Sequence, residues 1–145
     1  MADARMRAKA AQASGLHLVL NRKHDAYATI MKRSNNQNPW IEICPGIKRQ
    51  TKASGRTMYQ MLAVLEAGSK MREHRHPHEQ IVHILEGRMK LIVAGKPREL
   101  ATGDSFYLAS NVAHGVETIE NTRVLDTFSP PRDEYLALDE EARKR

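Results

Sequence analysis

Short apolar stretches, each followed by turn-forming residues, recur from Trp40 almost to the C-terminus. No helix-length amphipathic segment interrupts them, which argues against alternating strands and helices. Short strands at this spacing are typical of an all-β sandwich or barrel. The stretches are IEIC (41–44), TMYQMLAVLE (57–66), QIVHILE (80–86), RMKLIVA (88–94), SFYLA (105–109) and TRVLDTF (122–128).

The two ends of the chain have a different pattern. Residues 2–13 are rich in the helix formers Ala, Arg and Lys, and the polar run SNNQNP at 34–39 indicates a domain boundary. The last stretch, SPPRDEYLALDEEARKR, predicts a helix that is capped by Ser129, with a proline in its first turn, acidic residues near its start and basic residues at its end. We therefore expect a basic extension over 1–38, a β-barrel over 39–132 and a charged helix or tail over 133–145.

Composition places the chain among globular proteins. Of its 145 residues, 41% are hydrophobic and 28% are charged, which is enough for one domain with its own core. No apolar run approaches the roughly 18 residues of a membrane span, and the N-terminus lacks the apolar segment of a secretory signal. The single cysteine, Cys44, fits a small core residue in a reducing compartment. We expect a cytoplasmic protein without a membrane partner.

The net charge of +6 is concentrated at the N-terminal end. Residues 1–35 contain seven Lys or Arg and two Asp, so they contribute +5 and the rest of the chain +1. Basic segments can bind polyanions, but no zinc-finger, helix-turn-helix or RNA-recognition motif accompanies this one. We therefore expect no nucleic-acid partner.

Three of the seven histidines lie in the stretch HRHPHEQ, residues 74–80. A scattered histidine is ordinarily a solvated surface group. His74 and His76, however, are two positions apart in an apolar β context, so on a strand both side chains point to the same side. Two imidazoles at this spacing form half of a typical divalent-metal site.

The remaining ligands are less clear from spacing alone. Pro77 turns the chain after the first two histidines, so strand phase does not choose among His78, Glu79 and Gln80. His114, in SNVAHGV after a Gly-Asp turn, is a further candidate from a separate segment.

Two segments resemble the two conserved motifs of the cupin superfamily: GSKMREHRHPHEQIVHILEG at 68–87 and GDSFYLASNVAHGV at 103–116. The resemblance implies the cupin double-stranded β-helix, a jelly-roll barrel, which agrees with the all-β pattern. It also implies that four side chains bind one divalent metal ion: His74, His76, Gln80 and His114. His78 and Glu79 are then spacer residues, solvated or in a supporting role.

Cupins commonly have glutamate as the third ligand, and Gln80 replaces it here. Because an amide oxygen adds no charge, three imidazoles and Gln80 leave the site close to the full charge of the metal. Such a site is a strong electrophile toward an anionic ligand. The ligand types suit Zn, Ni, Mn, Fe or Cu and do not choose among them.

Among cupins, the chain resembles the KdgF-like proteins of pectin and alginate breakdown, through HPHEQIVHILEGR, GDSFYLASNVAHGV and VLDTFSPPRDEYL. This resemblance implies a metal-dependent enzyme, of the isomerase type, that opens the ring of 4,5-unsaturated monouronates to give the open-chain keto acid. It implies Asp126 as the catalytic residue, Phe128 and Arg132 as substrate-binding residues, and a homodimer. The partner would be a small anionic sugar acid.

Some positions depart from the family pattern. Ala109, Ser110 and Ala113 replace usual prolines, and His83 replaces a common aromatic residue. By alternation from Gln80, His83 faces away from the metal, toward packing or a dimer surface. Two other functions remain open: a metal-dependent cupin dioxygenase or lyase on another small oxygenated substrate, and a non-catalytic cupin that binds sugar acids.

Overall fold

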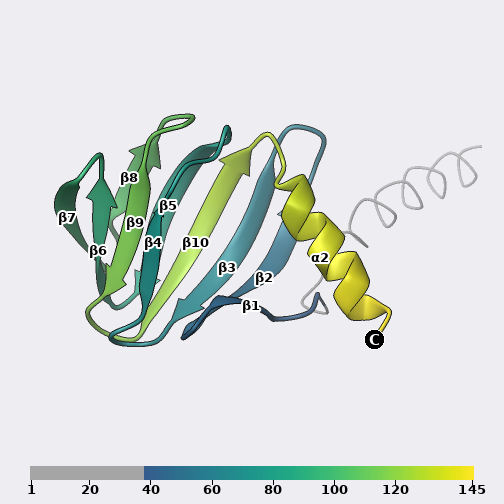
Figure 1. Cartoon of the computed structure of the whole chain (residues 1–145), viewed down its shortest axis with the longest axis horizontal. Helices are drawn as coiled ribbons and strands as arrows, with labels where there is room; N and C mark the ends of the chain where they lie inside the picture. The colour runs from purple at the N-terminus through teal and green to yellow at the C-terminus, as the bar shows by residue number, and fades with distance from the viewer. Residues whose placement is uncertain (1–37) are drawn as a thin grey trace, which may run out of the picture. The chain divides into compact units, whose positions relative to one another are not determined.

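The computed structural model describes residues 38–145, so the predicted extension over 1–38 lies outside the described residues except for Asn38. The described part contains ten strands followed by one helix (Figure 1). In chain order these elements are β1 (Ile41–Cys44), β2 (Ile47–Ser54), β3 (Tyr59–Leu65), β4 (Lys70–His74), β5 (Glu79–Glu86), β6 (Arg88–Val93), β7 (Lys96–Ala101), β8 (Ser105–Leu108), β9 (His114–Thr118), β10 (Thr122–Ser129) and α2 (Asp133–Arg143).

The strands form two antiparallel sheets. One has six strands in the order β1-β2-β3-β10-β5-β8, and the other has four in the order β4-β9-β6-β7. From β3 onward, the chain passes repeatedly from one sheet to the other, which is the arrangement of a double-sheet jelly roll. The predicted all-β fold is therefore confirmed.

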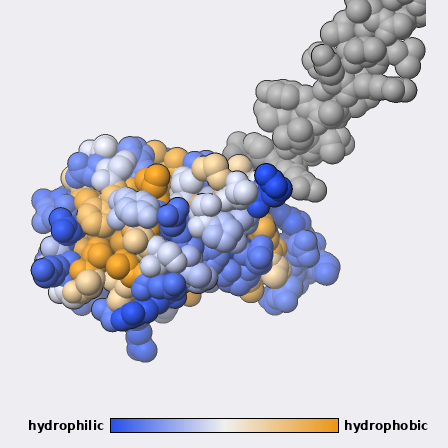
Figure 2. All heavy atoms as spheres, turned by 90° about the horizontal axis from the view of Figure 1, so that it is seen from above, coloured by the Kyte–Doolittle hydropathy of each residue, from blue (hydrophilic) through white to orange (hydrophobic). Residues whose placement is uncertain are grey.

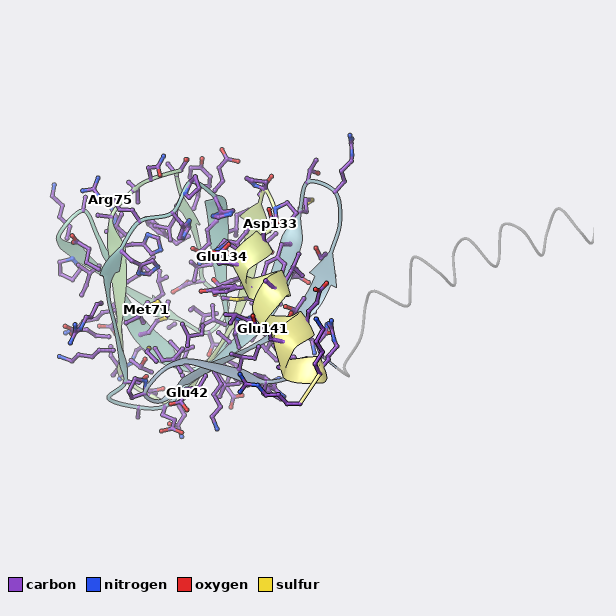
Figure 3. The ribbon with its side chains drawn as sticks, turned by 45° about the vertical axis from the view of Figure 1, so that its right-hand side comes forward. Glu42, Met71, Arg75, Asp133, Glu134 and Glu141 are labelled. Atoms are coloured by element: carbon purple, nitrogen blue, oxygen red, sulfur yellow. The ribbon has the colours of Figure 1, made fainter. Side chains whose placement is uncertain are left out.

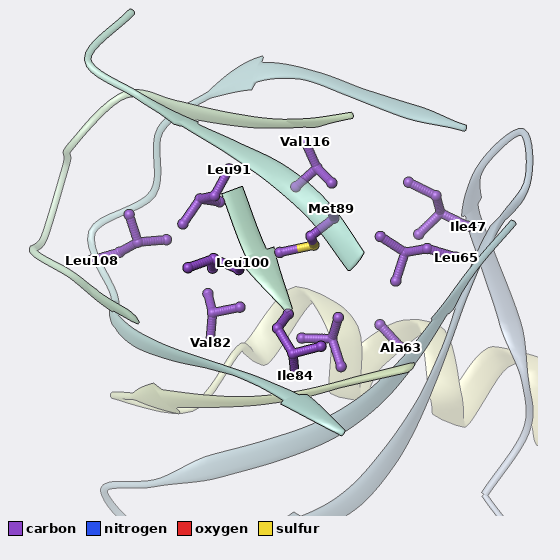
Figure 4. Close-up of a cluster of buried hydrophobic side chains, with 11 residues drawn as sticks. Ile47, Ala63, Leu65, Val82, Ile84, Met89, Leu91, Leu100, Leu108 and Val116 are labelled. Atoms are coloured by element: carbon purple, nitrogen blue, oxygen red, sulfur yellow. The ribbon is translucent and has the colours of Figure 1, made fainter. Parts of the chain in front are cut away.

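The hydrophobic core lies between the two sheets (Figure 4). Buried and more exposed side chains alternate along β5 and β10, because successive side chains of a strand point to opposite faces. Removing apolar surface of this kind from water is the main favourable term in folding. The buried cluster comprises Ile47, Ala63, Leu65, Val82, Ile84, Met89, Leu91, Leu100, Leu108, Val116 and Val124.

The turn between β5 and β6 requires a glycine. Gly87 has a φ of +96°, a conformation that side chains rarely adopt. A Cβ at this position would also overlap the carbonyl oxygen of Asn121. The glycine that ends the first motif is therefore required both by the backbone conformation and by packing.

The helix α2 is attached to the inner face of β2 by a buried polar network. Arg49 donates from Nη1 to the Asp139 carboxylate at 2.9 Å, and both side chains are fully buried. Thr51 donates to the other Asp139 oxygen at 2.5 Å and also hydrogen-bonds the Tyr59 hydroxyl at 2.6 Å. Arg49 further donates from Nη2 to the carbonyl oxygen of Tyr135 at 2.9 Å. These bonds hold the helix where it can contribute side chains to the interior of the barrel.

The predicted cap of this helix is wrong. Ser129 belongs to β10, and its hydroxyl donates to the carbonyl oxygen of Thr57. Both prolines precede the helix, which begins at Asp133 after Arg132 and has no side-chain cap. The acidic residues in the first turn and Arg143 in the last turn are placed as predicted. Among residues 38–145, no helix is long and apolar enough to cross a membrane.

Candidate metal centre

Three histidines meet where β4 ends and β9 begins. His74 is the last residue of β4 and lies directly opposite His114, the first residue of β9. Their ring centroids are 4.3 Å apart, and the ring of His76 lies 4.8 Å from that of His114. One nitrogen of each ring lies within 4.8 Å of the others, a grouping that could hold a metal ion.

Backbone carbonyl groups orient all three rings. The Nδ1 atom of each histidine lies 2.9–3.0 Å from a carbonyl oxygen two residues away: Arg72 for His74, His78 for His76 and Val112 for His114. Because a carbonyl only accepts, Nδ1 carries the proton and Nε2 keeps its lone pair. A hydrogen bond of this kind fixes the tautomer of histidines that bind metals.

Burial favours the neutral form of two of these rings, those of His76 and His114. It lowers the pKa of His76 to about 4, and the positive charge of Arg132 and the neighbouring His114 act in the same direction. Burial also lowers the pKa of His114. Neutral imidazoles bind divalent metals without first losing a proton.

Gln80 joins this cluster through its amide oxygen, which lies 3.1 Å from Nε2 of His76. The amide nitrogen is occupied in donating to Oδ1 of Asp126 at 2.8 Å. Since His76 carries its proton on Nδ1, the contact between Gln80 and His76 brings two lone pairs together without a hydrogen atom. Facing lone pairs are stabilised by a cation, so the donor set fits a metal ion.

Asp126 lies beside the predicted ligand Gln80 on the neighbouring strand, β10. Its carboxyl group is buried, which raises the pKa to about 6, although the hydrogen bond from Gln80 and the charge of Arg132 lower it. A carboxyl group with a pKa in this range can both accept and donate a proton near neutral pH.

The other predicted site residues, Phe128 and Arg132, lie beside each other and beside the rings of His76 and Tyr135. Phe128 is buried, and its ring meets that of His76 edge to face at 5.7 Å between centroids. The Arg132 guanidinium lies 4.9 Å from the centre of the Phe128 ring and 4.2 Å from that of Tyr135. Its Nε donates to Glu134 at 2.5 Å, and neither terminal nitrogen has a hydrogen-bond partner among the described residues. These nitrogens are therefore free to bind a carboxylate.

One cavity brings all seven predicted site residues together, and Tyr135 also lines it. Their assignment as metal ligands and catalytic or binding residues remains a prediction. Figure 3 shows that Arg75, which directly follows β4, and the first turn of α2 lie at the same end of the barrel. The seven predicted site residues that line the cavity are His74, His76, Gln80, His114, Asp126, Phe128 and Arg132.

The two predicted spacer residues, His78 and Glu79, lie in different environments. His78 is buried, and its carbonyl oxygen accepts the hydrogen bond from Nδ1 of His76. The Nδ1 atom of His78 itself has no hydrogen-bond partner among the described residues. Glu79 is exposed and accepts a hydrogen bond from Tyr107. His83 lies on the opposite face of β5 from Gln80, where it hydrogen-bonds Ser105.

Tyr135 is the site residue that sequence reasoning missed. It follows Arg132 by three residues, a spacing that places two side chains on neighbouring positions of a helix surface. That spacing was the available signal. It was not sufficient, because the direction of the helix relative to the barrel depends on the buried Arg49–Asp139 pair.

Comparison with known proteins identifies the family. Residues 61–128 match the Cupin domain family. The pectin degradation protein KdgF of Dickeya dadantii is 33% identical over 104 residues, which cover 70% of this chain and 94% of that protein. The structure of KdgF from a Halomonas species superposes with a TM-score of 0.65 at 29% identity, covering 70% of this chain and 94% of that one.

An RmlC-like cupin from Shewanella frigidimarina gives the same TM-score of 0.65 and 29% identity, covering 70% of this chain and 91% of its own. Residues 61–128 include β4 and β9, which carry His74 and His114, and the part of β10 that carries Asp126. The chain therefore belongs to the cupin superfamily, and within it the chain resembles KdgF.

Proposed function

We propose that this cupin opens the ring of 4,5-unsaturated monouronates, released from pectin or alginate, to the open-chain keto acid. The observation that carries the proposal is the hydrogen bond of 2.8 Å between Gln80 and Asp126. It couples a buried carboxyl group to the candidate metal ligands, while Arg132 lies in the same cavity. The similarity to a pectin degradation protein supports the same class of substrate.

Four side chains would hold the metal: His74, His76, Gln80 and His114. A divalent ion bound there would polarise the oxygen atoms of an anionic ligand. The all-neutral ligand set leaves that ion its full charge, which favours binding of a carboxylate over a change of oxidation state. The donor types suit Zn, Ni, Mn, Fe or Cu.

Different residues of the cavity would bind the substrate and transfer the proton. Arg132 would bind the substrate carboxylate with its free terminal nitrogens, and Phe128 and Tyr135 would form the wall against which the sugar ring lies. Asp126 would accept the proton of the anomeric hydroxyl as the bond between C1 and the ring oxygen breaks. It would then return that proton to C4 as the resulting enolate becomes a ketone, so no atom is gained or lost.

The test is the loss of ultraviolet absorbance of the C4=C5 double bond in unsaturated galacturonate, measured against spontaneous decay in buffer. We expect the metal-loaded wild type to exceed the buffer rate and Asp126→Asn to lose most of that excess. Asp133→Asn is the matched control, because it removes an exposed carboxylate at the start of α2 and should retain the wild-type rate. A wild-type rate equal to that of buffer would refute the ring-opening function. Oxygen consumption by the Fe(II)-loaded protein would instead indicate a dioxygenase.

We also propose that the protein is a homodimer. Large apolar side chains reach the surface of the described part, and Figure 2 shows apolar residues gathered on one face. Ile81 and Tyr107 are paired across β5 and β8 and are 49% and 56% exposed, while Leu85 is 41% exposed. Exposed apolar groups on a sheet surface are typical of interaction sites.

Light scattering should therefore give about twice the chain mass of 16.4 kDa. Ile81→Glu should shift the protein to a monomer, because it buries a charge in the interface. Leu138→Glu, at an exposed apolar position on α2, should leave the mass unchanged. A wild type of monomer mass would contradict the proposal.

A further inference from the structure

Strand β4 contains one residue more than its partner can pair with. Lys70 pairs with Glu117 and Met71 with Val116, but His74 pairs with His114. Two residues, Arg72 and Glu73, therefore lie opposite the single residue Gly115. This arrangement is a β-bulge.

The bulge decides which way His74 points. Met71 and His74 are three positions apart, and in a regular strand their side chains would lie on opposite faces. Both nevertheless line the cavity, while Arg72 and Glu73 are both exposed. The extra residue thus restores His74 to the interior face, where it meets His114. The carbonyl oxygen of Arg72, a bulge residue, also accepts the hydrogen bond from Nδ1 of His74.

Gly115 leaves the space that the bulge occupies. A Cβ on this residue would lie 2.9 Å from the carbonyl oxygen of Met71, 3.2 Å from the amide nitrogen of Glu73 and 3.5 Å from the carbonyl carbon of Arg72. All three atoms belong to the backbone of β4, which cannot move aside as a flexible side chain would. A side chain at this position therefore displaces the bulge itself.

We infer that Gly115 is a positioning residue of the metal centre: it admits the bulge in β4 and thereby directs His74 at the metal. The inference rests on the metal-binding part of the proposed function and is independent of the substrate. A side chain at position 115 is expected to damage metal binding through His74, although Gly115 itself offers no ligand atom.

The test uses Co²⁺ as the probe, because its visible spectrum reports the number and type of ligands. Gly115→Ala should bind Co²⁺ about 10-fold or more weakly than the wild type, and its spectrum should match that of His74→Ala. Circular dichroism should show that the metal-free barrel still folds. Gly55→Ala is the matched control, since a Cβ there meets no atom closer than 3.8 Å, and it should bind as the wild type does.

A second variant keeps the inference testable if Gly115→Ala folds poorly. Deleting Glu73 from Gly115→Ala removes the surplus residue, so a regular strand again directs His74 inward and Co²⁺ binding should recover. Wild-type affinity and spectrum in Gly115→Ala, or no recovery on deleting Glu73, would overturn the inference. A wild type that binds no Co²⁺ would overturn the metal proposal together with this one, whereas a failed uronate assay alone would leave this inference standing.

Discussion

Gln80 connects the candidate metal site with the candidate acid–base group. Its neighbour Glu79 has the side chain that more often binds metals in cupins, but Glu79 is exposed and Gln80 is buried. A carboxylate at position 80 could bind a metal ion, but it could not donate a hydrogen bond to Asp126 as the amide does. The amide therefore serves two neighbours of different kind, with its oxygen toward His76 and its nitrogen toward Asp126.

The variant Gln80→Glu tests this double role. It should keep the metal, because a carboxylate is also a ligand, but slow ring opening by about 10-fold or more, because two carboxylates then face each other where a hydrogen bond had been. Metal content by mass spectrometry and the ultraviolet assay separate the two effects. Gln60→Glu, the same change at a half-buried position on β3, is the control. An unchanged rate in Gln80→Glu would show that the hydrogen bond to Asp126 is unimportant.

At the scale of elements, the site depends on how α2 attaches to the barrel. Arg132 immediately precedes the helix and Tyr135 lies in its first turn, so both follow its position. The helix makes apolar contacts through Tyr135 and Leu136 with a small cluster of Tyr59, Met61 and Phe128. The fully buried Arg49–Asp139 pair, with the hydrogen bonds around it, attaches the helix to β2. The helix is thus a component of the cavity as well as the end of the chain.

Breaking this pair should destabilise the protein strongly. Asp139→Ala leaves the Arg49 guanidinium buried without its counter-charge, and we expect the free energy of unfolding to fall by about 3–5 kcal/mol. Chemical denaturation measures this change. Glu140→Ala, at the adjacent exposed position, should change stability by less than about 0.5 kcal/mol. A loss below about 1 kcal/mol in Asp139→Ala would show that water or other groups satisfy Arg49.

Among the strands that the predicted apolar stretches did not include, β2 and β7 each have a structural reason. β2 reads IKRQTKAS, and its inward positions include Arg49 and Thr51, which bind the helix rather than the apolar core. β7 is an edge strand of the four-stranded sheet, contains Pro97 and is exposed along most of its length. Hydrophobic pattern identifies strands that bury apolar residues, so it fails where a strand lies at an edge or faces a polar network.

At the scale of the whole molecule, charge is distributed unevenly along the chain. The first 35 residues contribute +5 of the net +6. A variant without residues 1–35 should therefore elute from a cation exchanger at clearly lower salt near pH 7, because its net charge is +1. Since none of the predicted ligands lies in the removed segment, Co²⁺ affinity should be retained. A loss of Co²⁺ binding on truncation would show that the segment supports the metal centre.

The sequence alone determined the fold class and the chemistry of the candidate ligands. Strand-length apolar runs and the spacing of His74 and His76 are local features. Gln80 and His114 joined the candidate ligands through the resemblance to the cupin motifs. The tertiary structure decided how those ligands are oriented and which groups accompany them. The bulge opposite Gly115, the contact between Gln80 and Asp126, and the place of Tyr135 all depend on the pairing of segments distant in the chain. Register and docking arise from contacts between such segments, so no local pattern could specify them.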